Sequence, residues 1–135
     1  MTLILRATDL IKDTKLIYAQ PSETVEVAVK RMASHNIGSI PIVDGNMKII
    51  GIVTERDVVR LLASKGPTIL QEKLENVMTR KLVTANPEDP ISALAYKMIE
   101  HGIRHLPVVD QEGKLLGVIS IRKVLRHLIA GLEHP

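Results

Sequence analysis

Several absences limit what this chain of 135 residues can be. It has no Cys, which excludes disulfides, thiolate nucleophiles and cysteine-based metal sites. It has two Tyr but no Phe or Trp, whereas single-strand nucleic-acid binders stack bases on aromatic side chains. No apolar run approaches the ~20 residues that span a bilayer, and the N-terminus, MTLILRATD, has no apolar region of signal-peptide length. We therefore expect a cytoplasmic protein with no membrane segment, and nucleic acid is a less favoured partner.

What the chain does contain suits a packed aliphatic domain with a charged surface. Apolar residues make up 45% of it and charged residues 24%. The formal net charge is +3, which fits an anionic small ligand, an acidic partner or weak nucleic-acid contact and selects none of them.

The strongest signal in the sequence is an internal repeat. Placing Pro21 on Pro87 aligns the two halves at an offset of 66 (87 − 21) without a gap. The matched pairs then include Met32 with Met98, His35 with His101, Pro41 with Pro107, Asp44 with Asp110, Gly51 with Gly117 and Arg56 with Arg122. Chance does not hold one register over so many positions, so the chain is a duplicated unit.

Each copy has the same predicted layout. A short apolar lead-in, LIYA (16–19) or LVTA (82–85), is followed by a helix with one apolar stripe. Two apolar runs joined by a tight turn then predict a hairpin, and a second helix closes the unit. The predicted class is α/β (α+β), with two pseudo-symmetric β-α-β-β-α units at residues 7–66 and 67–132. Because a unit of ~60 residues is marginal alone, we expect the two to pack against each other and form a cleft.

The helix ends can also be predicted. Asp89 followed by Pro90 is a typical N-cap and first-turn pair. His35 and His101 fall at the C-terminal ends of the predicted first helices, where a histidine interacts favourably with the helix dipole.

The hairpin segments carry a family resemblance. HNIGSIPIVDGNMKIIGIVTERD (His35 to Asp57) and HGIRHLPVVDQEGKLLGVIS (His101 to Ser120) resemble the CBS domain, named for cystathionine β-synthase. Two copies in tandem resemble a Bateman module, and the resemblance covers residues 7–132. It implies a regulatory module that binds AMP, ADP, ATP or S-adenosylmethionine. It also implies a homodimer, and an enzyme or transporter that the module regulates.

The T-x-x-D turn, Thr54 to Asp57, has two physical interpretations. Thr can cap a helix, and an acid three residues later completes a capping box and suits the positive end of the helix dipole. Alternatively, the carboxylate can accept hydrogen bonds from both hydroxyls of a ribose, and the helix start can hold a phosphate. The second copy has Ser120 and Lys123 instead. A lysine there opposes the dipole and cannot accept from a ribose.

The resemblance assigns residues to one nucleotide site and to an impaired second set. In the first set, Asp57 holds the ribose and Thr54 the ribose or phosphate. The lead-in of the other copy contacts adenine and basic residues face phosphate, and these residues are Leu82, Val83, Arg104, His105 and Arg122. The second set consists of Leu16, Ile17, Tyr18, Ser39, Ser120 and Lys123. Because it has a lysine in place of the acid and lacks the Arg-His pair, we expect it to bind nucleotide weakly or not at all.

Other functions have less support in the sequence. No nucleophile motif, phosphate-binding glycine loop or metal-ligand spacing is present, so we expect no enzyme, no required cofactor and no metal site. The basic residues Arg122, Lys123, Arg126 and His127 predict a solvated helix face, and they also motivate the alternative of a nucleic-acid-binding protein. A purely structural dimerisation module is the other alternative.

Overall fold

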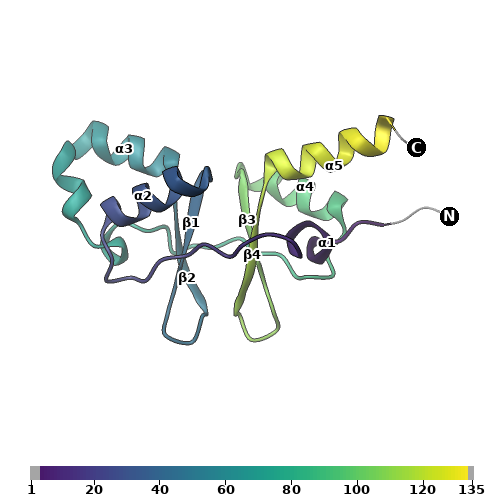
Figure 1. The fold of residues 1–135 in the computed structure, drawn as a ribbon, viewed down its shortest axis with the longest axis horizontal. Coiled ribbons are helices and arrows are strands. Elements are labelled where there is room, and N and C mark those ends of the chain that lie inside the picture. Colours follow the sequence, from purple (N-terminus) through teal and green to yellow (C-terminus); the bar gives the residue numbers. More distant parts are fainter. Residues whose placement is uncertain (1–3, 134–135) are drawn as a thin grey trace. The chain divides into compact units, whose positions relative to one another are not determined.

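The structure, a computed structural model, describes residues 4–133. The chain forms two compact units (Figure 1). The first unit is Ile17–Leu82, and the second unit joins residues 4–16 to residues 83–133. In chain order the elements are α1 (Ala7–Ile11), α2 (Val25–His35), β1 (Ser39–Val43), β2 (Ile49–Thr54), α3 (Glu55–Lys65), η1 (Pro67–Gln71), η2 (Leu74–Asn76), α4 (Ile91–His101), β3 (His105–Val109), β4 (Leu115–Ser120) and α5 (Ile121–Glu133).

The first unit is built on an antiparallel hairpin. Its register runs from Ser39 opposite Thr54 to Val43 opposite Ile49. β1 is buried along its whole length, α2 packs against β1, and α3 packs against β2 and α2. The core is aliphatic, as the composition predicts, and includes Val25, Ala28, Met32, Ile40, Ile42, Val53, Val58, Ile69 and Leu74.

The second unit repeats this hairpin in the same register. His105 lies opposite Ser120 and Val109 opposite Leu115, and the pairing shifts at the equivalent step in both hairpins. Its core includes Leu10, Leu94, Met98, Leu106, Val108, Ile119 and Val124. The mixed helix-and-strand class is therefore confirmed, with one small antiparallel sheet in each unit.

The predicted lead-in strands are reduced to single bridges. The Ala19 N–H donates to the Pro41 carbonyl at 3.0 Å, and the Ala19 carbonyl accepts from Val43 at 2.9 Å. Ala85 makes the equivalent pair of bonds with β3. Each lead-in thus pairs in parallel with the first hairpin strand of its unit, β1 or β3, at one residue only.

The two hairpin turns are stabilised by the same pattern of hydrogen bonds to an aspartate side chain. The Asp44 Oδ1 atom accepts from two backbone N–H groups of its turn, at 2.8 and 3.0 Å. Asp110 does the same in the second unit, at 2.9 Å in both cases. The third residue after each Asp has a positive φ, 64° at Met47 and 83° at Gly113. Only the second copy has the glycine that this conformation favours.

Each unit contains the segment that precedes the other repeat. The residues around α1 precede the first repeat but pack in the second unit, whereas those around η2 precede the second repeat but pack in the first. The N–H groups of Ala7 and Leu74 donate to the carbonyls of Asp89 and Glu23, each at 2.8 Å. The compact units are therefore not continuous stretches of repeat sequence.

These two segments also align with each other, at an offset one residue larger than that of the repeats. An offset of 67 (72 − 5) aligns LRATDLI (5–11) with EKLENVM (72–78). The Leu5 carbonyl accepts from Ile91 at 2.9 Å, and the Glu72 carbonyl accepts from Val25 at 3.0 Å. The two segments are structurally equivalent although no residue is identical between them.

The glycine kept in both copies lies where these segments approach the hairpin. A Cβ atom added at Gly117 would lie 2.9 Å from Ile11 Cγ2, and one added at Gly51 would lie 2.6 Å from Met78 Cγ. These distances are shorter than van der Waals contact. The segments around α1 and η2 can therefore approach the hairpins this closely only if residues 117 and 51 are glycine.

The helix ends agree with the sequence only in part. His35 and His101 do end α2 and α4. The predicted cap at Asp89 is wrong, because Pro90 is the N-cap residue of α4 and makes no side-chain cap. The Asp89 carboxylate accepts from the Asn86 N–H instead. None of the helices in residues 4–133 has the length and apolar character that crossing a bilayer requires.

Candidate functional site

The T-x-x-D turn of the first unit forms a reciprocal cap. Thr54 is the N-cap residue of α3, and its Oγ1 accepts from the Asp57 N–H at 3.1 Å. The Asp57 Oδ2 accepts from the Thr54 N–H at 2.9 Å. The capping interpretation is therefore confirmed for this copy. The carboxylate oxygen that caps the helix is Oδ2.

Two other segments of the first unit lie beside this turn. Ser39 pairs with Thr54 and is buried, and the Glu55 N–H donates to the Gly38 carbonyl at 2.9 Å. The segment leading to Leu82 follows β2, because Ile52 and Thr79 exchange two backbone hydrogen bonds of 3.0 Å.

The equivalent turn of the second unit has only half of the cap. Ser120 Oγ accepts from the Lys123 N–H at 3.2 Å, but a lysine has no oxygen with which to return the bond. The Lys123 ammonium instead donates to Thr14 Oγ1 at 3.4 Å. His105 pairs with Ser120, and the exposed Arg104 accepts at its carbonyl from Ile121.

The predicted site residues are divided between the units. From the first set, Thr54, Asp57 and Leu82 belong to the first unit, whereas Val83, Arg104, His105 and Arg122 belong to the second. From the second set, Ile17, Tyr18 and Ser39 belong to the first unit, and Leu16, Ser120 and Lys123 to the second. The assignment of either set to one ligand stays a prediction.

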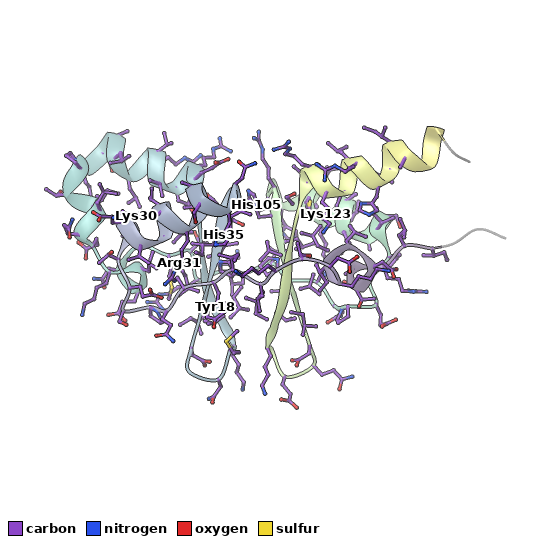
Figure 2. The ribbon with its side chains drawn as sticks, in the orientation of Figure 1. Tyr18, Lys30, Arg31, His35, His105 and Lys123 are labelled. Atoms are coloured by element: carbon purple, nitrogen blue, oxygen red, sulfur yellow. The ribbon has the colours of Figure 1, made fainter. Side chains whose placement is uncertain are left out.

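A basic side chain clamps the lead-in of each unit. In the first unit Arg31 donates to Glu23 at 2.9 and 2.6 Å and to the Tyr18 carbonyl at 2.9 Å (Figure 2). In the second unit Lys97 donates to the Thr84 carbonyl at 2.8 Å and contacts the acid at the position equivalent to Glu23. The hydrogen bond from Arg31 lowers the pKa of Glu23 from its ordinary value. Each clamp thus holds a backbone carbonyl of its lead-in, that of Tyr18 in the first unit and that of Thr84 in the second.

Sequence reasoning missed this clamp, although a signal was present. At the offset of 66, Arg31 matches Lys97 and Glu23 matches Asp89, so both copies keep a base and an acid eight residues apart. The signal is the repetition of this charge pair, because a spacing of eight residues lies outside the rule for helix ion pairs three or four residues apart.

The basic residues of α5 do not form one solvated face. Arg122 and Arg126 are exposed, whereas Lys123 and His127 are partly buried. The His127 Nδ1–H donates to the Lys123 carbonyl at 2.9 Å. Within residues 4–133, no three His, Cys, Asp or Glu side chains are grouped so as to hold a metal ion.

Comparison with known families identifies the repeat. The sequence profile of the CBS domain matches residues 7–64 and again residues 74–130. The chain belongs to the CBS domain family. Both copies of the repeat are thus CBS domains, and the chain contains a tandem pair.

Solved CBS structures share this fold. The CBS domain pair of protein MJ0100, solved in complex with 5′-methylthioadenosine and S-adenosyl-L-methionine, has a TM-score of 0.85 and 30% identity, covering 96% of this chain and 98% of that one. The CBS-domain containing protein ATU1752 from Agrobacterium tumefaciens has a TM-score of 0.84 and 27% identity, covering 93% and 95%.

Relatives by sequence differ in length. A 17.7 kDa protein of Acidianus ambivalens is 32% identical over 119 residues, which are 88% of this chain and 71% of that protein. Homoserine O-acetyltransferase of Methanococcus vannielii is 37% identical over 115 residues, but the chain spans only 23% of it. CBS pairs thus occur in this family both as most of a protein and as a small part of an enzyme.

Proposed function

We propose that this CBS pair is a regulatory module that binds an adenine-containing ligand, either an adenine nucleotide or S-adenosylmethionine. The observation that carries the proposal is the likeness over nearly the whole chain to a CBS pair solved with two adenosine derivatives. The chain also keeps one acid and one hydroxyl, Asp57 and Thr54, at the start of α3. The ligand would act by favouring one arrangement of the module over another.

The chemistry of the turn suits a ribose. Asp57 can cap α3 through Oδ2 and still accept hydroxyl protons at Oδ1. Thr54 accepts from the Asp57 N–H at its Oγ1, so its own hydroxyl proton is left to donate to a ligand oxygen. We assign the adenine contacts to Leu82 and Val83. Two further groups, Arg104–His105 and Arg122, would then face the phosphates. We assign no nucleotide to the set that contains Lys123.

A thermal-shift panel tests this function. Purified protein freed of bound nucleotide is heated with AMP, ADP, ATP, S-adenosylmethionine or NAD at matched ionic strength. A ligand at 100 times its dissociation constant adds about 2.7 kcal/mol, which raises Tm by roughly 5–10 °C for a chain of this size. A rise with one ligand names it, and no rise with any of them would contradict the proposal.

We further propose that two copies of the module pair through the helices of the second unit. Large apolar side chains are exposed there at positions where the first unit has smaller or charged ones. They are Tyr96, Ile99, Leu125 and Ile129, which replace Lys30, Ala33, Val59 and Ala63. Light scattering after size exclusion should give a dimer that Leu125→Glu dissociates and the matched Val59→Glu does not. A monomeric wild-type chain would refute the pairing.

A further inference from the structure

The second unit has an open apolar groove of ≈ 570 Å³. It lies between residues 4–5, the start of α4 and the C-terminal half of α5. Leu5, Pro90, Ile91, Leu128 and Gly131 line it. The volume is within the range of binding sites that take small apolar groups.

The equivalent position in the first unit is covered. There η1 follows α3 directly and packs against both α2 and α3, the helices that correspond to α4 and α5. Its side chain Ile69 is only 3% exposed and belongs to the core of that unit. One structure therefore shows the same helix pair with and without a covering turn.

An apolar side chain holds this covering turn in place. Two backbone hydrogen bonds of η1 are local, from the Ile69 N–H to the Gly66 carbonyl and from the Glu72 N–H to the Ile69 carbonyl, at 3.3 and 3.0 Å. Two polar contacts reach α2, from Gln71 to Glu26 at 3.3 Å and from the Val25 N–H to the Glu72 carbonyl at 3.0 Å, and the second unit has the equivalent of the latter between Ile91 and Leu5. A segment that covers such a helix pair therefore needs chiefly a branched aliphatic side chain, which gains about 1.5–3 kcal/mol when fully buried.

Within residues 4–133, no turn equivalent to η1 follows α5. In the sequence alignment that matches residues 5–11 with 72–78, the position of Ile69 corresponds to Thr2, a polar residue. On α5, Gly131 stands where α3 has Lys65, and a Cβ there would meet no atom within 4 Å. The glycine adds no side chain to the groove from α5.

We propose that this groove binds a branched aliphatic side chain from a short turn of a partner polypeptide, as the first unit binds Ile69. Two polar side chains border it, Ser92 and His127. Because the His127 Nδ1–H is held by the Lys123 carbonyl, the neutral ring presents Nε2 as an acceptor. Nε2 and the Ser92 hydroxyl can thus bond the backbone on either side of the buried side chain.

The chain supplies its own probe for this site. A peptide of residues 66–72, GPTILQE, is titrated to roughly 5 mM into the full-length ¹⁵N-labelled protein. The control is the same peptide with Ile69→Asp. We expect shifts of the Ser92, His127 and Gly131 amides, and smaller shifts at the equivalent Glu26 and Lys65. The control peptide should bind at least about tenfold more weakly, since it cannot bury a carboxylate in an apolar groove.

Two variants of one glycine localise the binding. In Gly131→Leu the new side chain enters the groove from α5, and peptide affinity should fall at least about tenfold. Gly131→Ala also raises the helix propensity of α5, but the methyl group does not fill the groove. Peptide affinity should therefore be unchanged. Equal binding by the two peptides, or no effect of Gly131→Leu, would overturn the proposal. Binding that appears only after residues 1–3 are removed would also overturn it, because the chain would then fill its own groove.

Discussion

Replacing Lys123 by Asp would give α5 the reciprocal cap that α3 already has. In α3 the carboxylate three residues after the cap accepts from the Thr54 N–H at 2.9 Å. In α5 the equivalent position has an ammonium that donates to Thr14 Oγ1, an exposed contact of 3.4 Å. Lys123→Asp therefore adds a charge-assisted hydrogen bond and removes a weak one.

The magnitude follows from two contributions. A charge of the favourable sign in the first turn contributes about 0.3–1 kcal/mol, and removal of the unfavourable one contributes as much again. A net hydrogen bond adds about 0.5–1.5 kcal/mol, and loss of the contact with Thr14 offsets a few tenths. We expect Lys123→Asp to stabilise the fold by about 1–3 kcal/mol, which raises Tm by roughly 2–12 °C.

Thermal unfolding followed by circular dichroism measures this effect. Asp57→Lys makes the opposite change in α3 and should lower Tm by a similar or larger amount. Arg126→Asp changes the net charge equally but lies beyond the first turn, so its effect should stay within about ±0.5 kcal/mol. The dipole part should shrink in 1 M salt while the hydrogen-bond part remains. If Lys123→Asp lowers Tm, or matches Arg126→Asp, the reasoning on the cap is refuted.

Three further changes test the packing, the turns and the clamp. Gly117→Ala should cost about 1–3 kcal/mol because its Cβ meets Ile11, and an undiminished urea midpoint would contradict the close approach. Met47→Gly should gain up to ~1 kcal/mol by relieving a φ of 64°, and a lower Tm would argue against strain. The hydrogen bond from Arg31 lowers the pKa of Glu23 below its ordinary value of 4.5. The Glu23 carboxylate therefore stabilises the fold above pH 4.5, and this stabilisation is lost as the pH falls through the lowered pKa. Glu23→Gln should therefore weaken the loss of stability at acid pH, and identical pH profiles would contradict the clamp.

Much of the fold could be predicted because it is encoded locally and encoded twice. The gapless register from Pro21 to Pro87 defines the duplicated unit, and the Asp-led turns at Asp44 and Asp110 define the hairpins. The cap from Thr54 to Asp57 depends on residues three apart, which a sequence motif captures well. In these places propensity, pattern and tertiary structure agree.

What the sequence did not predict depends on contacts between distant segments. Nothing in LRATDLI or EKLENVM indicates which repeat each packs on, because buried apolar side chains such as Leu10 and Leu74 would suit the aliphatic core of either unit. Asp89 failed as a cap because its carboxylate bonds back to Asn86, a local turn that competes with capping. The ligand set also stays a prediction, since its members come from both units.

Calorimetric titration of the ligand selected by the thermal-shift panel tests the central claim most directly. We expect one binding site per chain for the wild type. Asp57→Asn should weaken binding at least about tenfold, because the amide lacks the charge for a ribose diol. It should lower the stability by only about 0.3–1 kcal/mol, because the amide oxygen can still accept from the Thr54 N–H. Lys123→Ala should bind as the wild type does. Unchanged affinity in Asp57→Asn, or two sites of equal affinity per chain, would contradict a single adenine site built on the T-x-x-D turn.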